Sequence, residues 1–170
     1  MITEEIYRFQ NGPENLTAFD GKEHLMWTHE RLFTEILNGL KKAKEIGKIP
    51  YSVGIDTWGV DFGFLDKKGH LLANPVHYRD LRTVGIPAYS EDFVSSDEGY
   101  DITGIQVLEL NSLYQLLAVQ KNNPELFDIA ADMLFVPDLL NYFLTGYKQT
   151  EYTIASTSQL LDARKKDWSW

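Results

Sequence analysis

The sequence contains no cysteine among its 170 residues. This excludes disulfide bonds, thiol nucleophiles, and zinc or iron–sulfur centres held by cysteine. Histidine is also scarce, and the spacing of the four residues matches no HExxH motif or comparable ligand set. We therefore expect no metal site formed by His24, His29, His70 and His77.

Long apolar runs and basic excess are missing as well. No stretch approaches the ~18 apolar residues that cross a bilayer, and Glu4 and Glu5 stand where a secretion signal would be basic. The formal net charge of −9, from 25 acidic and 16 basic residues, repels phosphate backbones and anionic lipid heads. These features predict a cytoplasmic protein that binds neither nucleic acid nor membrane.

What is present is enough apolar sequence, 44%, to build a sizeable core. Residues 2–9 alternate loosely and predict a strand. A helix is predicted from Thr28 to Gly47, because apolar residues recur there at helical spacing. Residues 49–55 have the β-branched character of a buried strand, so that the helix would form a parallel crossover between the two strands.

The rest of the chain predicts a hairpin followed by helices. Residues 60–65 and 71–78 flank a polar turn that ends in Gly69. Helical spacing then recurs, with no repeat and no linker rich in Gly, Ser or Pro. The chain therefore reads as one α/β unit, with later helices at 89–96, 110–120 and 139–144.

The segment GIDTWGVDF, residues 54–62, combines polar and aromatic groups with glycine just past a predicted strand. Open α/β sheets bind ligands at the carboxyl ends of their strands. There Asp56, Thr57 and Asp61 would offer hydrogen bonds to sugar hydroxyls, Trp58 an apolar face, and Gly59 close backbone approach. A purely structural interpretation is also open: Asp56 would cap a loop, Trp58 would lie in the core, and Asp61 would lie on the solvent-facing side of a strand. Composition favours neither the ligand site nor this structural interpretation.

Other clusters carry weaker signals. The Arg79-Asp80-Arg82 group fits a ligand site or a structural network, and the latter is favoured. The hydroxyl-rich residues 151–159 are typical of caps and turns. Gly99 to Gly104 has the glycine spacing of a phosphate-binding loop but lacks the lysine and hydroxyl residue that must follow. Asp56 and Asp61 match the residue types of a glycosidase pair, but sequence spacing cannot establish their separation.

Taken whole, residues 54–83, GIDTWGVDFGFLDKKGHLLANPVHYRDLRT, resemble the rhamnulokinase branch of the FGGY carbohydrate kinases. Four later segments resemble further motifs of this family in the same order: Thr103–Gln106, Asn111–Leu116, Pro137–Gly146 and Glu151–Asp162. The resemblance implies a ribonuclease H-like, actin-like ATPase domain, a mixed sheet with flanking helices. It also implies ATP- and Mg²⁺-dependent phosphorylation of the 1-hydroxyl of L-rhamnulose in rhamnose catabolism.

The same resemblance implies an incomplete enzyme. Residues 1–170 would form part of the N-terminal domain, on its sugar-binding side, without the first phosphate-loop hairpin and the C-terminal nucleotide domain. We therefore expect no catalytic residue and no bound cofactor in this chain, which would be inactive alone. The missing C-terminal domain would be its natural packing partner, and its uncovered surface would favour self-association.

By resemblance, the ketose contacts are Gly59, Trp58, Asp61 and Thr57, with Arg79 near the same cleft. Two alternatives stay open: another FGGY kinase, acting on xylulose, fuculose or glycerol, or a non-catalytic sugar-binding module.

Overall fold

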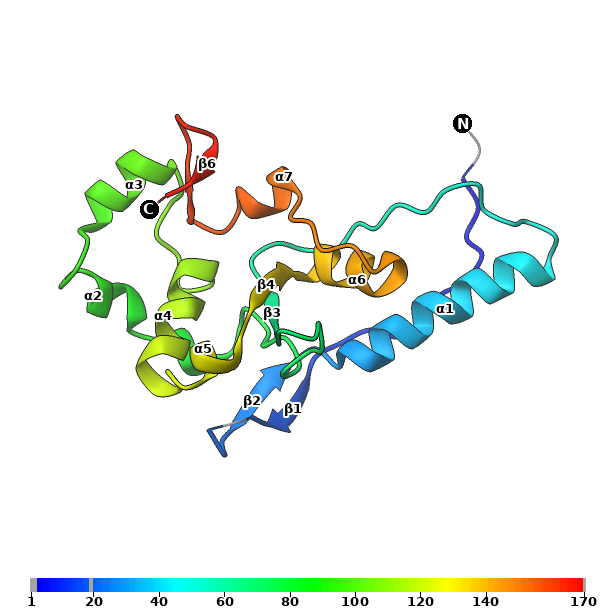
Figure 1. Ribbon diagram of the computed structural model, residues 1–170, viewed down its shortest axis with the longest axis horizontal. Coiled ribbons are helices and arrows are strands. Elements are labelled where there is room, and N and C mark those ends of the chain that lie inside the picture. The colour runs from blue at the N-terminus through cyan, green and yellow to red at the C-terminus, as the bar shows by residue number, and fades with distance from the viewer. Residues whose placement is uncertain (1–2, 19, 170) are drawn as a thin grey trace.

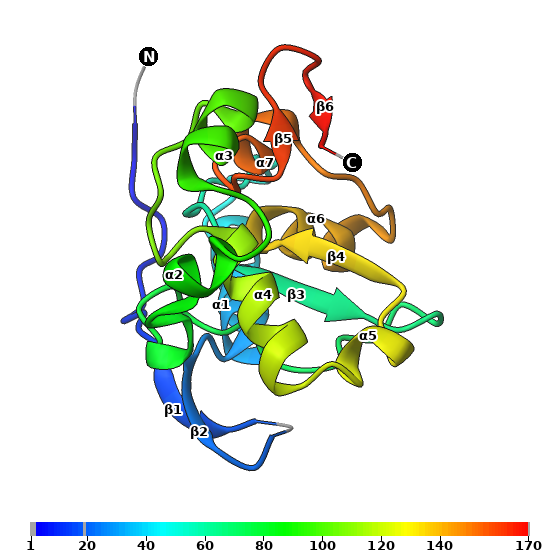
Figure 2. The same ribbon diagram turned by 90° about the vertical axis from the view of Figure 1, so that its left-hand side faces the viewer.

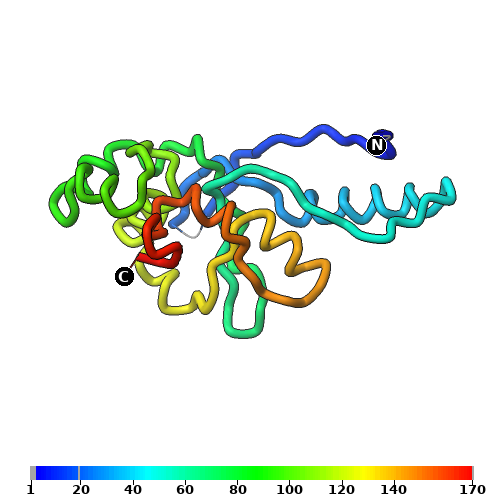
Figure 3. The backbone as a smooth tube through the Cα atoms, turned by 90° about the horizontal axis from the view of Figure 1, so that it is seen from above, coloured from blue at the N-terminus to red at the C-terminus, as the bar shows by residue number. Residues whose placement is uncertain are grey.

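The computed structural model describes residues 3–18 and 20–169 (Figure 1). Its longest element is helix α1, His29–Glu45, which projects from one end of the molecule (Figures 1 and 3). It follows Thr28 and ends before Gly47, whose positive φ of 76° suits glycine. Lys42 and Lys44 in its last turn complement the helix dipole. The helix predicted from the apolar spacing is confirmed.

In the described part of the chain, six strands form three separate two-stranded sheets, all antiparallel. The pair that lies in the core joins β3, Phe62–Leu65, to β4, Asp132–Phe135, with Phe62 opposite Phe135. The other pairs are β1 with β2, Glu14–Thr17 and Glu23–Met26, and β5 with β6, Leu161–Asp162 and Asp167–Trp168. The predicted parallel crossover is wrong: residues 3–18 and 20–169 contain no parallel pair and no single mixed sheet.

The segment 49–55 is not the buried strand that its composition predicts. It is extended but pairs with no strand of residues 3–18 and 20–169, and Ile49, Tyr51 and Val53 are exposed. Figure 1 shows this segment running back beside α1 from the far end of the helix. Residues 3–9 form no strand either, and residues 1–2 of that prediction lie outside the described residues. Strand propensity alone does not bury a segment, because a strand needs a partner for its backbone groups.

The predicted hairpin is present only close to its turn. Asp66 accepts a backbone hydrogen bond from Gly69, Leu65 bridges to Leu71, and the N–H of Leu72 donates to the carbonyl oxygen of Phe64. Beyond Leu72 the chain leaves β3 and makes a second isolated bridge, between Val76 and Met26. The true partner of β3 is therefore β4, which is remote in sequence.

Helices cover the β3–β4 pair on two sides, with α4, Ser112–Asn122, and α6, Val136–Thr145, on either side of it (Figures 1 and 2). These confirm the helices predicted at 110–120 and 139–144. The predicted helix at 89–96 is instead the end of α2, Ile86–Ser90, and the start of α3, Ser96–Thr103. The other short helices are η1, Leu81–Thr83, α5, Leu126–Ile129, and α7, Tyr152–Ala155.

Two apolar clusters fix this arrangement. One joins the strands to α4, and its fully buried member is Phe135. The other packs Trp27 and Leu32 against Val136 and Leu140 of α6, and Trp58 lies against it. No helix among the described residues is long and apolar enough to cross a membrane. The turn before β3 is thus held between two packed clusters.

Candidate functional site

The turn that precedes β3, residues 57–61, has an unusual backbone. Val60 adopts a left-handed φ of 68°, which β-branched residues rarely do. The N–H of Asp61 donates to the carbonyl oxygen of Gly59 at 2.9 Å, and this closes a three-residue turn. Such strain costs on the order of 1–3 kcal/mol and persists only where the surroundings hold it.

Helix α4 stabilises the strained turn through two side-chain hydrogen bonds. The hydroxyl of Ser112 donates to the carbonyl oxygen of Val60 at 2.7 Å, and the Nε2 of Gln115 donates to the same oxygen at 3.2 Å. Both side chains are buried. Because the first turn of α4 supplies both donors, the position of the turn depends on the position of the helix.

The carboxylate of Asp61 accepts hydrogen bonds from two tryptophans. Its Oδ2 accepts from the indole nitrogens of Trp27, at 2.7 Å, and Trp58, at 2.9 Å, and its Oδ1 accepts from Gln115 at 3.3 Å. Burial raises the pKa of the Asp61 carboxyl, while the hydrogen bonds from Trp27, Trp58 and Gln115 act in the opposite direction.

The structure therefore revises the place expected for Asp61. Its side chain is 0% exposed, neither on the wet face of a strand nor open to a ligand. A carboxylate taken out of water must be fully hydrogen-bonded, and here it is satisfied by two indoles and an amide. The ring centroids of Trp27 and Trp58 lie 4.1 Å apart and their planes are tilted by 35°, so Asp61 sets the orientation of a tilted aromatic pair.

Gly59 sits where no side chain fits. A Cβ on this residue would lie 2.7 Å from the Oγ1 of Thr157. Thr57, Trp58 and Gly59 are half-buried, and Asp56 is exposed. The turn is thus partly open, but none of its five residues lines the cavities of about 80, 580 and 460 Å³ in the described part of the chain.

Arg79 and Arg82 have different surroundings. Arg79 is exposed, with its guanidinium carbon 5.4 Å from the ring centre of Tyr78. Arg82 instead reaches inward, and its Nη2 donates to the Oε1 of Gln115 at 2.8 Å. Burial lowers the pKa of Arg82 to about 10, although Asp80, Asp61 and Asp20 act in the opposite direction. The structure links Arg82, rather than Arg79, to the turn, through Gln115.

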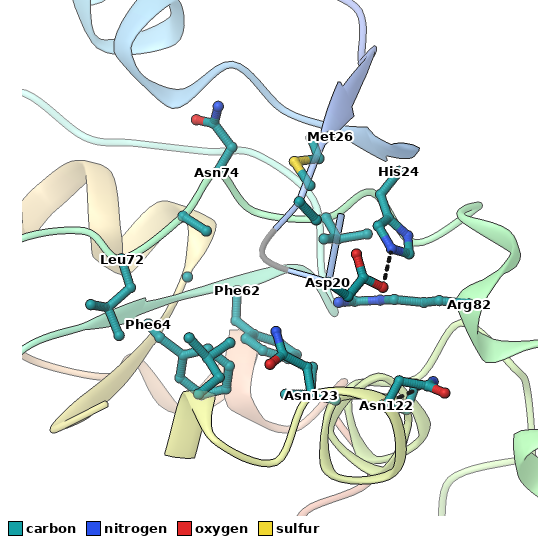
Figure 4. Close-up of a pocket in the computed structure, with 17 residues that line it drawn as sticks. Asp20, His24, Met26, Phe62, Phe64, Leu72, Asn74, Arg82, Asn122 and Asn123 are labelled. Carbon is teal, nitrogen blue, oxygen red and sulfur yellow. Dashed lines mark hydrogen bonds and ion pairs between the residues drawn. The ribbon is translucent and has the colours of Figure 1, made fainter. Parts of the chain in front are cut away.

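A small cavity of about 80 Å³ lies beside Arg82 (Figure 4). His24 spans two carboxylates there, at 3.1 Å from Asp20 and 2.9 Å from Asp80. Burial acts to lower the pKa of His24, but the hydrogen bonds to Asp80 and Asp20 act more strongly in the opposite direction. The pKa of His24 is therefore raised. Asp80 also accepts from the backbone N–H groups of Leu25 and Arg82, so the structural role favoured for this cluster is confirmed for Asp80.

The weaker sequence signals are resolved in the same way. In the hydroxyl-rich segment, Glu151 caps α7, and Ser156, Thr157 and Ser158 each donate to a backbone carbonyl three residues earlier. Gly104 ends α3 in a left-handed conformation, which is a helix cap. Within residues 3–18 and 20–169, no group of three or more carboxylates and histidines is placed to hold a metal ion.

Sequence reasoning missed Trp27, Ser112 and Gln115. Each is remote in the chain from the turn that it contacts, and each has an ordinary local role: a core aromatic or a helix residue. No local pattern identifies such partners, because tertiary packing brings them together. Together they hold a partly exposed turn that carries an indole and a hydroxyl, at the edge of an α/β unit.

The comparison with protein families is more specific. Residues 21–170 match the N-terminal domain of the FGGY family of carbohydrate kinases, and the chain belongs to this family. It is 46% identical over 160 residues to the rhamnulokinase of Bacteroides thetaiotaomicron, covering 94% of this chain and 32% of that protein. It is 42% identical over 165 residues to the rhamnulokinase of Oceanobacillus iheyensis, covering 97% of this chain and 34% of that protein. The chain thus spans about a third of the length of these relatives.

Solved structures confirm the fold class. A glycerol kinase from Plasmodium falciparum with ADP superposes with a TM-score of 0.78 at 18% identity, covering 95% of this chain and 34% of that chain. A ligand-bound xylulose kinase from Lactobacillus acidophilus superposes with a TM-score of 0.73 at 17% identity, covering 91% of this chain and 35% of that chain. These likenesses show the fold alone: the actin-like ATPase fold of the FGGY sugar kinases.

Proposed function

We propose that this chain is the sugar-binding part of an ATP-dependent kinase that phosphorylates the 1-hydroxyl of L-rhamnulose in rhamnose catabolism. The observation that carries the proposal is the 46% identity to the Bacteroides thetaiotaomicron rhamnulokinase, over nearly all of this chain. Family membership supports a phosphotransferase acting on a sugar. Xylulose and glycerol kinases share the fold at 17–18% identity, which does not favour them as alternatives.

We propose specific roles for the residues of the turn. The half-buried indole of Trp58 covers an apolar face of the ketose, Thr57 and the backbone at Gly59 contact its hydroxyls, and Arg79 reaches it from the rim of the same cleft. Asp61 is a positioning residue in this scheme, because its buried carboxylate holds Trp58 in place.

The chemistry also needs groups that this chain does not supply. Phosphoryl transfer depends on a base, a phosphate-binding loop and Mg²⁺ around ATP. We propose that residues 1–170 are a partial N-terminal domain, that a C-terminal domain carries the base and binds ATP with Mg²⁺, and that the enzyme is cytoplasmic. Alone, the chain would bind the ketose without turnover and would self-associate through uncovered surface.

A chimaeric enzyme tests the proposal. The matching third of the Bacteroides thetaiotaomicron rhamnulokinase is replaced by this chain, and ADP release is measured with L-rhamnulose, xylulose, fuculose and glycerol. We expect the highest kcat/KM with L-rhamnulose and no turnover by the 170-residue chain alone. Gly59→Ala should lower kcat/KM at least about tenfold, since an added methyl displaces the turn. Gly54→Ala is the matched control, because a Cβ at Gly54 meets nothing within 4 Å.

Three outcomes would contradict the proposal. A folded chimaera that prefers xylulose, fuculose or glycerol would assign the chain to another branch of the family. A folded chimaera that binds L-rhamnulose without phosphorylating it would favour the non-catalytic module. Turnover by the isolated chain would show that the catalytic groups lie within residues 1–170.

A further inference from the structure

Helices α2, α3 and α4 form one end of the molecule (Figure 1). A second, larger cavity lies among them. Its volume of about 580 Å³ falls within the range of small-molecule sites, roughly 300–1,000 Å³. None of the residues of the proposed sugar-binding turn lines it. Its walls are mainly apolar and aromatic, formed by Tyr89, Phe93, Ile102, Leu113, Leu117 and Leu160.

Gln159 provides a fixed polar group in this cavity. It is only 3% exposed and adopts a left-handed φ of 63°, which is strained for a residue other than glycine. Asn111 holds it by donating to its Oε1 at 2.8 Å. Its Nε2 lies on the Gly99 side of the cavity, 3.7 Å from the point that a Cβ on Gly99 would occupy. Strained and anchored side chains of this kind cluster at ligand sites.

Lys121 adds a positive charge on the α4 side. Its ammonium group lies 4.1 Å from the ring centre of Tyr89, on α2. In the described part of the chain, Lys121 takes part in no salt bridge. The carboxylate of Glu91, next to α2, is engaged by the backbone and hydroxyl of Ser96. Lys121 is exposed, so its ammonium group is a cation at the rim of an apolar cavity, with no salt-bridge partner in the described part of the chain.

From these three observations we propose that the cavity between α2, α3 and α4 binds a small molecule with a flat apolar body and one carboxylate. The apolar body would pack between Phe93, Leu117 and Ile102, where burial from water drives binding. The carboxylate would meet Lys121 in a charge-assisted hydrogen bond. The amide nitrogen of Gln159 is the second polar contact. This site is separate from the turn at Gly59 and does not depend on the proposed sugar kinase activity.

Calorimetric titration of the 170-residue chain with 1-naphthoate tests the proposal, and neutral 1-naphthalenemethanol serves as the matched ligand. We expect 1-naphthoate to bind at least about tenfold tighter than the alcohol, because only the acid pairs with the ammonium group. Lys121→Met should remove this preference while it leaves the alcohol unaffected. Lys41→Met is the control, since it removes an exposed lysine on α1, away from the cavity.

A cavity-filling variant tests the location. A Cβ on Gly99 makes only an ordinary contact, with Gln159, and the backbone there is not left-handed, so Gly99→Leu extends into the cavity without backbone strain. It should abolish binding of both ligands, and the smaller Gly99→Ala should weaken it less. Thermal melting verifies that each variant is folded. Absent binding of 1-naphthoate, equal binding of acid and alcohol, or unchanged affinity in a folded Gly99→Leu protein would each overturn the proposal.

Discussion

The hydroxyl of Ser112 donates to the carbonyl oxygen of Val60 at 2.7 Å, and this bond ties the first turn of α4 to a valine in the left-handed conformation. The two residues are far apart in the chain, and both are buried. The strained turn beside Trp58 and Gly59 is therefore stable only when α4 is docked against it.

Removing this bond should weaken the fold. We expect Ser112→Ala to lower the free energy of unfolding by about 1–3 kcal/mol, because the Val60 oxygen keeps only the longer bond from Gln115. Urea unfolding monitored by tryptophan fluorescence measures the change. Ser52→Ala is the control, since Ser52 is exposed and should change stability by less than about 0.5 kcal/mol. Equal effects of the two variants would show that the bond is not needed.

The contact between Gly59 and Thr157 makes a steric prediction. Gly59→Ala should destabilise the chain by about 1–3 kcal/mol, because the new methyl group overlaps the Thr157 hydroxyl. The double variant Gly59→Ala/Thr157→Ala should recover part of this loss, since it removes the Oγ1 and Cγ2 atoms in the way. Thermal melting of both single variants and the double variant measures the recovery. A loss that is simply additive would refute the contact.

Asp138 makes a prediction for pH. It is 4% exposed, its Oδ2 has no hydrogen-bond partner among the described residues, and burial raises its pKa to about 6. The unfolded pKa is about 3.9, so its favourable contribution is present below that value and is lost as the pH rises through about 6. Asparagine stays neutral at every pH. From pH 5 to pH 8, the free energy of unfolding of Asp138→Asn should therefore rise by about 1 kcal/mol relative to that of the natural chain.

Urea unfolding of the natural chain and of Asp138→Asn, at about pH 5 and about pH 8, measures this difference in the free energy of unfolding. Groups that titrate equally in the two proteins cancel. Glu151, whose N–H donates to the Asp138 carboxyl, is retained in both. A difference that does not vary with pH would show that Asp138 titrates normally in the folded chain.

The exposed segment 49–55 makes a prediction for self-association. It carries no charged residue, and Ile49, Tyr51 and Val53 alternate along an extended backbone that pairs with no strand in the described chain. Such a segment is a template for pairing with a second copy. We expect concentration-dependent association in sedimentation velocity, at least about tenfold weaker in Val53→Lys, because a charge on an edge opposes pairing. Val84→Lys, exposed elsewhere, is the control.

A single sedimentation series decides the point. Association that is unchanged in Val53→Lys would place the contact on another surface. A chain that stays monomeric at all concentrations would reject self-association altogether.

The sequence alone predicted what depends on neighbouring residues. Apolar spacing located α1 nearly to its ends, and hydroxyl-rich residues indicated the caps at 151–159. The motif around Gly59 indicated the family, because a resemblance of residues requires no coordinates. These signals are local, since helix periodicity and cap chemistry operate over a few residues.

Tertiary structure decided what depends on partners remote in sequence. The same strand-like composition is buried in β3, which has β4 beside it, and exposed in residues 49–55, which pair with no strand in the described chain. Asp61 is buried because Trp27 and Gln115 converge on it, and Arg82 rather than Arg79 turns inward because Gln115 accepts its hydrogen bond. A buried charge or strand is stable only when distant groups satisfy it, and no local pattern contains those groups.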